Sequence, residues 1–233
     1  MDSLDISKKV AASMKGSDDP NFKRIHHYDH HVVLFIKDYI LKEKCKNYFE
    51  IGTHFGHSLC TALQSKYKSK FVSCDLFDVG NSIAEDCQIN NVEKLANDNA
   101  SALNKNNYEF IILKDNSTLP DTKEKVKQLL PEGIDLLFID GDHHYKTILI
   151  EFNLYYPLVN KGGYIVFDDY LPFSLNGVDR ECPKAINQIE SKYKEDIESG
   201  PPSSMLPSMP RGLYPTLEEG NTKANCTYIF KKL

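Results

Sequence analysis

The sequence predicts an α/β protein with a doubly wound, mostly parallel sheet, helices on both faces and an antiparallel strand near the C-terminus. First, residues 136–139 are apolar without interruption, as expected for a strand that helices cover on both sides. Second, short apolar runs alternate with helical patterns of about 10 to 15 residues, which is typical of βαβ units. Third, two of these runs end abruptly in Asp140 and Asp168, at the strand ends where open α/β sheets bind ligands.

Each expected element follows from its own pattern. The strands are short runs rich in apolar residues: 46–51, 71–75, 108–113, 134–140, a fifth that ends near 168, and 226–231. The helices have apolar residues every three or four positions: 57–66, 92–103, 122–130, 145–156 and 183–197. Pro131 closes the third of these helices, and two glycines make 52–56 a turn. The last strand is expected to pair antiparallel at or near the sheet edge.

The expected domain spans residues 45–233. Residues 1–44 form a polar lead-in with a helical pattern at 32–41, and they are a candidate lid. The stretch 199–216 contains five prolines, which exclude regular structure there. A loop too long for a simple connector is usually a functional lid or a disordered segment, and we favour a lid here.

Composition narrows the functional classes. The 233 residues are 41% hydrophobic and 26% charged with a net charge of −5, so nothing favours a nucleic-acid partner. No segment approaches the roughly 18 apolar residues that span a membrane, and the polar N-terminus does not look like a secretory signal. The six cysteines lack paired spacing, which favours reduced thiols in a cytoplasmic protein. The sequence leaves a homo-oligomer open.

The turn after the first strand has the features of a ligand cradle. Gly52 allows a sharp turn and close approach of a ligand, and Gly56 allows tight packing of strand and helix. The spacing differs from that of a dinucleotide site, and the preceding Glu50 suits a cationic or amine-bearing ligand. Asp75 ends the second strand, where acids commonly bind ribose hydroxyls. The alternative is that the two glycines serve only helix–strand packing.

The segment Glu50-Ile-Gly52-Thr-His-Phe-Gly56-His-Ser58 resembles motif I of class I S-adenosylmethionine-dependent methyltransferases, which have a Rossmann-like fold, and especially that of catechol and caffeoyl-CoA O-methyltransferases. The resemblance implies that Glu50 reaches the methionine end of the cofactor through water and that Asp75 binds its ribose. It implies further cofactor contacts at the turn and beyond it, from Thr53, Gly52, Gly56, Ser58, Ser117 (near the adenine) and Asp140.

Three acids follow two strands that are neighbours in a doubly wound sheet. Asp140 ends one strand, and Asp168 and Asp169 end the other, so their side chains are expected to converge. Clustered carboxylates repel one another unless a cation joins them, and oxygen ligands favour Mg²⁺, with Ca²⁺ or Mn²⁺ as alternatives. Asp142 and His143 are candidate general bases for a substrate hydroxyl. The competing interpretation is that residues 142–144 cap the next helix and 168–169 are turn residues.

Residues 139–145 and 162–170 resemble the macrocin and mycinamicin sugar O-methyltransferase branch of this class. That branch implies a divalent metal on Asp140, Asp168 and Asp169, with Asp142 or His143 as base. The expected function is therefore metal-dependent methyl transfer to a hydroxyl of a sugar or polyol-like small molecule. Two alternatives remain open, a metal-dependent hydroxylase or oxygenase on the same fold and a cofactor-binding protein without activity; a nicotinamide dehydrogenase is disfavoured by the glycine spacing.

Overall fold

The structure is a computed structural model that describes residues 45–64, 70–77, 91–168, 170, 181–199, 213–215 and 226–233. The expected lead-in 1–44, most of the proline-rich stretch, and Asp169 lie outside these residues. Inter-residue contacts divide the chain into two compact units. The described residues up to Tyr48 belong with Gly52–Asn116 to the first unit, and Phe49–Ile51 belong with Ser117–Leu233 to the second.

The strands form the predicted mostly parallel sheet. They are β1 (Asn47–Ile51), β2 (Lys70–Asp75), β3 (Phe110–Lys114), β4 (Ile134–Ile139), β5 (Val159–Phe167), β6 (Ile197–Ser199), β7 (Leu213–Pro215) and β8 (Cys226–Lys232). Their order is β3-β2-β1-β4-β5-β8-β6, and β7 pairs with β8. The pairs β2–β3 and β4–β5 are parallel, whereas β8 is antiparallel to β5, β6 and β7. This confirms the expected antiparallel C-terminal strand.

The helices agree with the expected pattern within a few residues. They are α4 (His57–Ala62), α6 (Val92–Leu103), α7 (Pro120–Leu129), α8 (Tyr145–Tyr155), the 3-10 helix η1 (Tyr156–Leu158) and α9 (Glu181–Tyr193). The helix expected at 183–197 ends at Tyr193, and β6 follows it. The stretch expected to lack regular structure contains β7, which ends at Pro215. Proline is tolerated at strand ends and sheet edges, because no ladder hydrogen bond needs its missing N–H there.

In the first unit, α4 packs on β2 and α6. Gly56 has a φ of 85°, and a Cβ at this position would lie 3.5 Å from the carbonyl oxygen of Ala96 in α6. Asn99 of α6 donates its side-chain amide to the carbonyl of Phe55 at 3.0 Å. A contact of 3.5 Å leaves room for a Cβ, so the positive φ of Gly56 is what favours glycine here, and its role in tight strand–helix packing stays a prediction.

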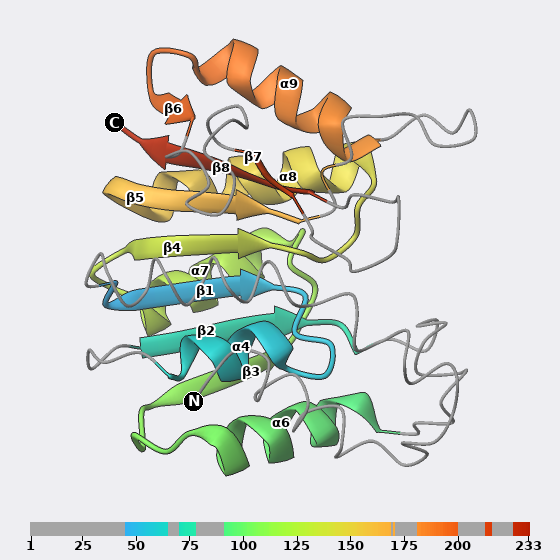
Figure 1. The fold of residues 1–233 in the computed structure, drawn as a ribbon, viewed down its shortest axis with the longest axis vertical. Coiled ribbons are helices and arrows are strands. Elements are labelled where there is room, and N and C mark those ends of the chain that lie inside the picture. Colours follow the sequence, from blue (N-terminus) through green and yellow to red (C-terminus); the bar gives the residue numbers. More distant parts are fainter. Residues whose placement is uncertain are drawn as a thin grey trace. The chain divides into compact units, whose positions relative to one another are not determined.

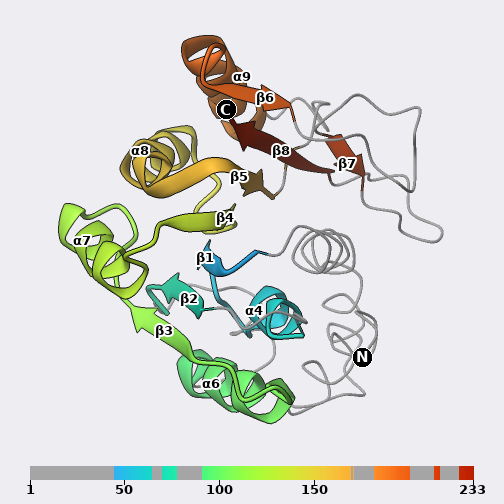
Figure 2. The same cartoon turned by 90° about the vertical axis from the view of Figure 1, so that its left-hand side faces the viewer.

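In the second unit, β4, β5 and β8 lie side by side (Figure 1). The central strand β4 is buried at every position except Asp135, as its unbroken apolar run predicts. Helices α7 and α8 lie on the same side of β4 and β5 (Figure 2), and α8 also contacts α9. Buried Phe152 of α8 stacks beside Phe167 of β5 and meets Tyr193 of α9 edge-on, which fixes this helix on the sheet.

The structure bears on two features that the composition raised, membrane-spanning segments and cysteines. Within the described stretches, no helix has both the length and the apolar character required to cross a membrane. Four of the six cysteines, Cys45, Cys60, Cys74 and Cys182, are buried free thiols. The reduced state of the cysteines stays a prediction.

Candidate active site

The turn after β1 is a tightly wound loop in the first unit. Gly52, His54 and Gly56 all have positive φ angles, of 96°, 46° and 85°. The N–H of Gly52 donates to Cys74 of β2 at 2.9 Å, and that of Gly56 donates to Thr53 at 2.7 Å. Left-handed backbone at alternate positions is readily adopted by glycine, which explains the two glycines of the motif.

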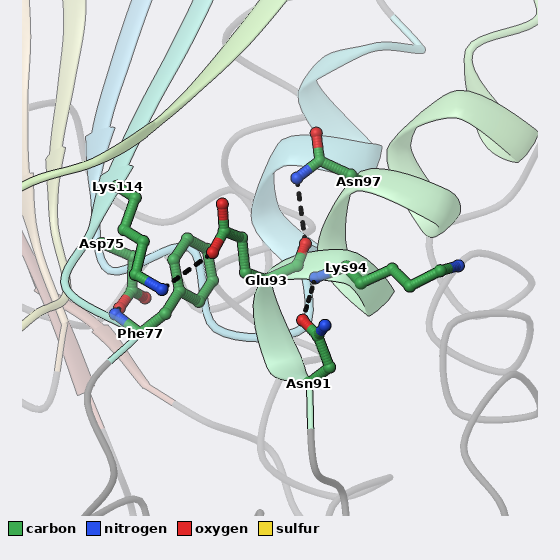
Figure 3. A network of polar contacts seen from close by, with 7 residues as sticks. All are labelled: Asp75, Phe77, Asn91, Glu93, Lys94, Asn97 and Lys114. Atoms are coloured by element: carbon green, nitrogen blue, oxygen red, sulfur yellow. Dashed lines mark hydrogen bonds and ion pairs between the residues drawn. The ribbon is translucent and has the colours of Figure 1, made fainter.

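Asp75, at the end of β2, ties this turn to the strand. Its Oδ2 accepts the backbone N–H of His54 at 2.8 Å, and its Oδ1 accepts that of Phe77 at 2.7 Å. Figure 3 shows Asp75 and Phe77 together, close to the ion pair between Lys114 and Glu93 at 2.9 Å. Each carboxylate oxygen has two lone pairs, so an oxygen that accepts one such bond retains capacity for a ligand hydroxyl. The sequence predicted a ribose-binding acid here, but not its role in shaping the turn.

Two hydroxyl residues of the predicted cofactor set are buried in the first unit. Thr53 is 1% exposed, and its hydroxyl forms a short hydrogen bond with that of Ser73 on β2. Its side chain is thus engaged in holding the turn. Ser58 lies in the first turn of α4 and is 8% exposed.

In the second unit, Glu50 and Asp140 come from adjacent strands of the sheet. Glu50 of β1 is fully buried, and the N–H of Asp140 donates to the carbonyl of Ile51 at 2.9 Å. A Cβ at Gly141 would lie 3.0 Å from the Ile51 side chain. The glycine after Asp140 therefore lets the end of β4 pass close to β1.

Asp140 and Asp168 follow paired residues at the ends of β4 and β5. Ile139 pairs with Phe167, and the N–H of Asp168 donates to the carbonyl of Ile139 at 3.1 Å. The two acids thus leave neighbouring parallel strands at the same edge, as expected. Thr227 of β8 donates its hydroxyl to Asp168 Oδ1 at 3.1 Å, a buried partner that the sequence did not reveal.

The chemistry of this pair fits a hard divalent cation, because both side chains offer only oxygen. Asp169, the expected third ligand, lies outside the described residues. Among the side chains that the structure describes, no group of three His, Cys, Asp or Glu residues has the geometry of a metal site. The metal assignment therefore stays a prediction.

The two candidate bases have different surroundings. Asp142 accepts hydrogen bonds from the Thr147 hydroxyl at 2.8 Å and from the backbone N–H and ring of His144. Partial burial raises the pKa of Asp142, but these hydrogen bonds and the charge of His144 outweigh it, so the pKa is lowered overall. His143 instead lies beside the expected metal ligand, with its Nε2 3.8 Å from Asp140 Oδ1. A carboxylate with a lowered pKa is a poor proton acceptor, so His143 is the better candidate.

The helix-cap interpretation of residues 142–144 describes part of what is seen. His144 is the N-cap residue of α8, but its side chain makes no capping bond and turns to Asp142. The hydrogen bond and charge of Asp142 raise the pKa of the exposed His144. Glu181 of α9 accepts the N–H of Tyr145 at 2.7 Å and so supplies a cap from another helix.

Sequence reasoning missed Glu151, an acid on the buried face of α8. It is 1% exposed, and its Oε1 accepts the Ser117 hydroxyl at 2.6 Å. Burial, with a further contribution from the charge of Asp142, raises its pKa to about 7, although the bond from Ser117 lowers it. A signal was present: Glu151 falls between Ile148 and Phe152 on the apolar side of the helix, where an acid needs a special reason.

Comparison with known proteins agrees with this architecture. Residues 49–170 match the methyltransferase domain family. A protein of Acanthamoeba polyphaga mimivirus, "Uncharacterized protein R132", is 33% identical over 180 residues, 77% of this chain and 72% of that protein.

Solved structures with much lower identity share the fold. The O-methyltransferase from Bacillus cereus in complex with S-adenosylhomocysteine has a TM-score of 0.58 at 15% identity, covering 99% of this chain and 90% of that chain. The O-methyltransferase TomG from Streptomyces achromogenes, in complex with S-adenosylmethionine, has a TM-score of 0.58 at 13% identity, covering 100% and 90%. The sheet order, the glycine turn and the family match agree, and this chain belongs to the methyltransferase domain family.

Proposed function

We propose that this chain transfers the methyl group of S-adenosylmethionine to a hydroxyl of a sugar or polyol-like small molecule, with the help of a divalent cation. The observation that carries the proposal is the pair of acids, Asp140 and Asp168, at the joined ends of β4 and β5. In a protein of the methyltransferase family, an acidic pair of this kind suits a metal ion that binds the acceptor hydroxyl.

The cofactor assignment names three parts of the ligand and the residues expected at each. The turn at Gly52–Gly56, shaped by Asp75, suits close approach of a nucleoside, and Asp75 retains capacity for ribose hydroxyls. Glu50, buried at the end of β1, is assigned to the cationic methionine end, and Ser117 to the adenine. Two structural neighbours, from Bacillus cereus and Streptomyces achromogenes, were solved with S-adenosylhomocysteine and S-adenosylmethionine, which supports the same ligand here.

The chemistry is a direct displacement. S-adenosylmethionine, when bound, would supply the methyl group, which would pass from its sulfonium sulfur to the acceptor oxygen and leave S-adenosylhomocysteine as the second product. His143 takes the hydroxyl proton, because it lies beside Asp140, whereas the hydrogen bonds that Asp142 accepts weaken that carboxylate as a base. Asp140, Asp168 and Asp169 would hold Mg²⁺, which lowers the pKa of the hydroxyl and fixes the acceptor.

The decisive test separates cofactor binding from metal dependence. S-adenosylhomocysteine is titrated calorimetrically into wild type and Asp168→Ala with and without Mg²⁺, and methyl transfer is assayed on a panel of sugars and polyols. We expect micromolar-order binding in both proteins, and turnover in wild type alone that EDTA abolishes. Asp121→Ala, an exposed acid of α7, is the control and should behave as wild type. Absence of binding to wild type overturns the cofactor assignment; turnover that resists EDTA overturns the metal.

The alternatives receive less support. A two-histidine iron site for an oxygenase needs His143 and His144 to face one metal, whereas His144 is turned to Asp142. A cofactor-binding protein without activity would bind S-adenosylhomocysteine yet methylate none of the acceptors, an outcome that the same assay detects.

A further inference from the structure

We propose that Glu151 and Tyr155 of α8 are positioning residues. They hold Ser117 in the orientation in which its hydroxyl recognises the amino group of the cofactor's adenine. The proposal rests on the cofactor assignment above, which puts Ser117 beside the adenine. It adds two side chains from a different element and a reason why the site would prefer adenine to other purines.

The two residues hold two of the polar groups of Ser117, its hydroxyl and its carbonyl. Glu151 Oε1 accepts the Ser117 hydroxyl at 2.6 Å, and the Tyr155 hydroxyl donates to the Ser117 carbonyl at 2.9 Å. Residues four apart on a helix lie on the same face, so one rigid element fixes Ser117 at two points. We call this arrangement, Glu151 and Tyr155 on Ser117, the serine clamp.

The clamp decides the hydrogen-bonding character of the Ser117 hydroxyl. A hydroxyl has one hydrogen and two lone pairs. Because the hydrogen points to Glu151, the oxygen offers only lone pairs to a ligand, and these accept the exocyclic amino group of adenine. Hypoxanthine has a carbonyl oxygen in place of that amino group. This oxygen and the Ser117 oxygen would both be acceptors, so no hydrogen bond would form between them. Glu151 can accept the hydrogen at Oε1 whether its carboxyl is neutral or ionised.

The packing keeps the carboxyl of Glu151 in place. Tyr155 is fully buried, with its ring centroid 4.9 Å from that of Phe49. A Cβ at Gly141 would come within 3.6 Å of Glu151 Oε1, so the end of β4 closes over the carboxyl.

The second carboxylate oxygen of Glu151 indicates that this acid serves a function and does not stabilise the fold. Oε2 is buried and has no hydrogen-bond partner among the described residues. An unsatisfied buried polar atom costs free energy, and a leucine at this position on an apolar face would avoid that cost. The role of Glu151 in orienting the Ser117 hydroxyl explains why an acid is present at this position.

The test compares two ligands that differ at the base, S-adenosylhomocysteine and S-inosylhomocysteine, by calorimetric titration. In Glu151→Leu we expect the affinity for the first to fall about tenfold and that for the second to be unchanged or higher, so the preference is lost. Glu151→Gln retains an acceptor oxygen and should keep most of the preference. Ser117→Ala should lose it, and Glu151→Leu should have little further effect in the Ser117→Ala background.

Matched tyrosine variants test the second contact. Tyr155→Phe should weaken binding of S-adenosylhomocysteine several-fold, by loss of one hydrogen bond. Tyr193→Phe also loses one hydrogen bond, which its hydroxyl donates to Asn153 Oδ1 at 2.8 Å and which does not involve Ser117. This variant should leave both affinities unchanged. Thermal unfolding of each variant confirms that the fold is retained.

Two results would overturn the clamp alone: wild type binds S-adenosylhomocysteine but Glu151→Leu keeps its full preference, or Tyr193→Phe weakens binding as much as Tyr155→Phe. If wild type binds neither ligand, the cofactor assignment fails and the clamp falls with it.

Discussion

The pKa values of two carboxyl groups near the same helix are shifted in opposite directions. Asp142 lies just before α8, half exposed, and receives three hydrogen bonds from Thr147 and His144, which lower its pKa. Glu151 lies inside α8 on its buried face and receives one, and burial raises its pKa. The comparison teaches that a carboxylate's charge is governed by how many donors surround it relative to how much water it has lost. The first arrangement suits a permanent anion, the second a group that titrates near neutrality.

The strongest challenge to this comparison is the pH dependence of stability. Because the folded state holds the Glu151 proton up to a pKa of about 7, against an ordinary value of 4.5, it binds more protons than the unfolded state between these values. Stability should therefore fall as pH rises through that window, by roughly 3 kcal/mol. Glu151→Gln should remove this fall in urea unfolding at pH 5 and pH 8. Glu124→Gln, an exposed acid of α7, should keep it. An identical slope in wild type and Glu151→Gln would contradict the raised pKa.

The opposite sign is expected at the start of α8. The lowered pKa of Asp142 means that its contribution is present above its ordinary value of 3.8 and is lost as pH falls through the folded value. Asp142→Asn should destabilise the protein by less than about 1 kcal/mol at pH 7, because the group is well exposed. Chemical unfolding at pH 7 and pH 3 measures it, and the difference between the proteins should shrink at the lower pH. A larger loss at pH 3 would be contrary to the prediction.

Thr147→Val sharpens the comparison by removing one donor while keeping the side-chain shape. The pKa of Asp142 should rise toward its ordinary value, because the hydroxyl no longer stabilises the carboxylate. Carbon-detected NMR titration of the carboxyl group reads the change directly. Ser117→Ala is the parallel change for Glu151: the pKa there should rise further, since the lost bond favours the anion. Unchanged titrations in both variants would show that the donors do not set these values.

The smallest effect concerns His144. Its pKa is raised above 6.5 by the hydrogen bond and charge of Asp142. In Asp142→Asn the pKa should return toward 6.5, as followed by NMR of the ring protons. A raised pKa of His144 that persists in the variant would point to another source.

The same contrast shows what sequence can and cannot predict. The fold was accessible because β4 is apolar at every position except Asp135 and the flanking helices repeat with helical periodicity. The short strand β7 was not, because its pairing with β8 depends on a partner many residues away and the local prolines argue against it. Glycine and acid positions around Gly52 and Asp140 could be placed at strand ends from their spacing.

The partners of those site residues were beyond sequence reasoning. Thr227 on Asp168, Ser73 on Thr53 and Glu151 on Ser117 join segments separated by 59, 20 and 34 positions. Such pairings depend on register and side-chain direction, which the hydrophobic pattern does not encode. Asp75 was predicted as a ligand-binding acid, whereas its bonds to the turn depend on the positive φ of His54.

The contact between Thr227 and Asp168 has a consequence for biosynthesis. A ribosome adds about 5 to 20 residues each second, so the aspartate is made about 3 to 12 s before the threonine that steadies it. Throughout that interval the nascent polypeptide carries this acid without its hydroxyl neighbour, however well the earlier strands have already associated. Maturation of this corner of the protein is thus timed by translation of its last strand.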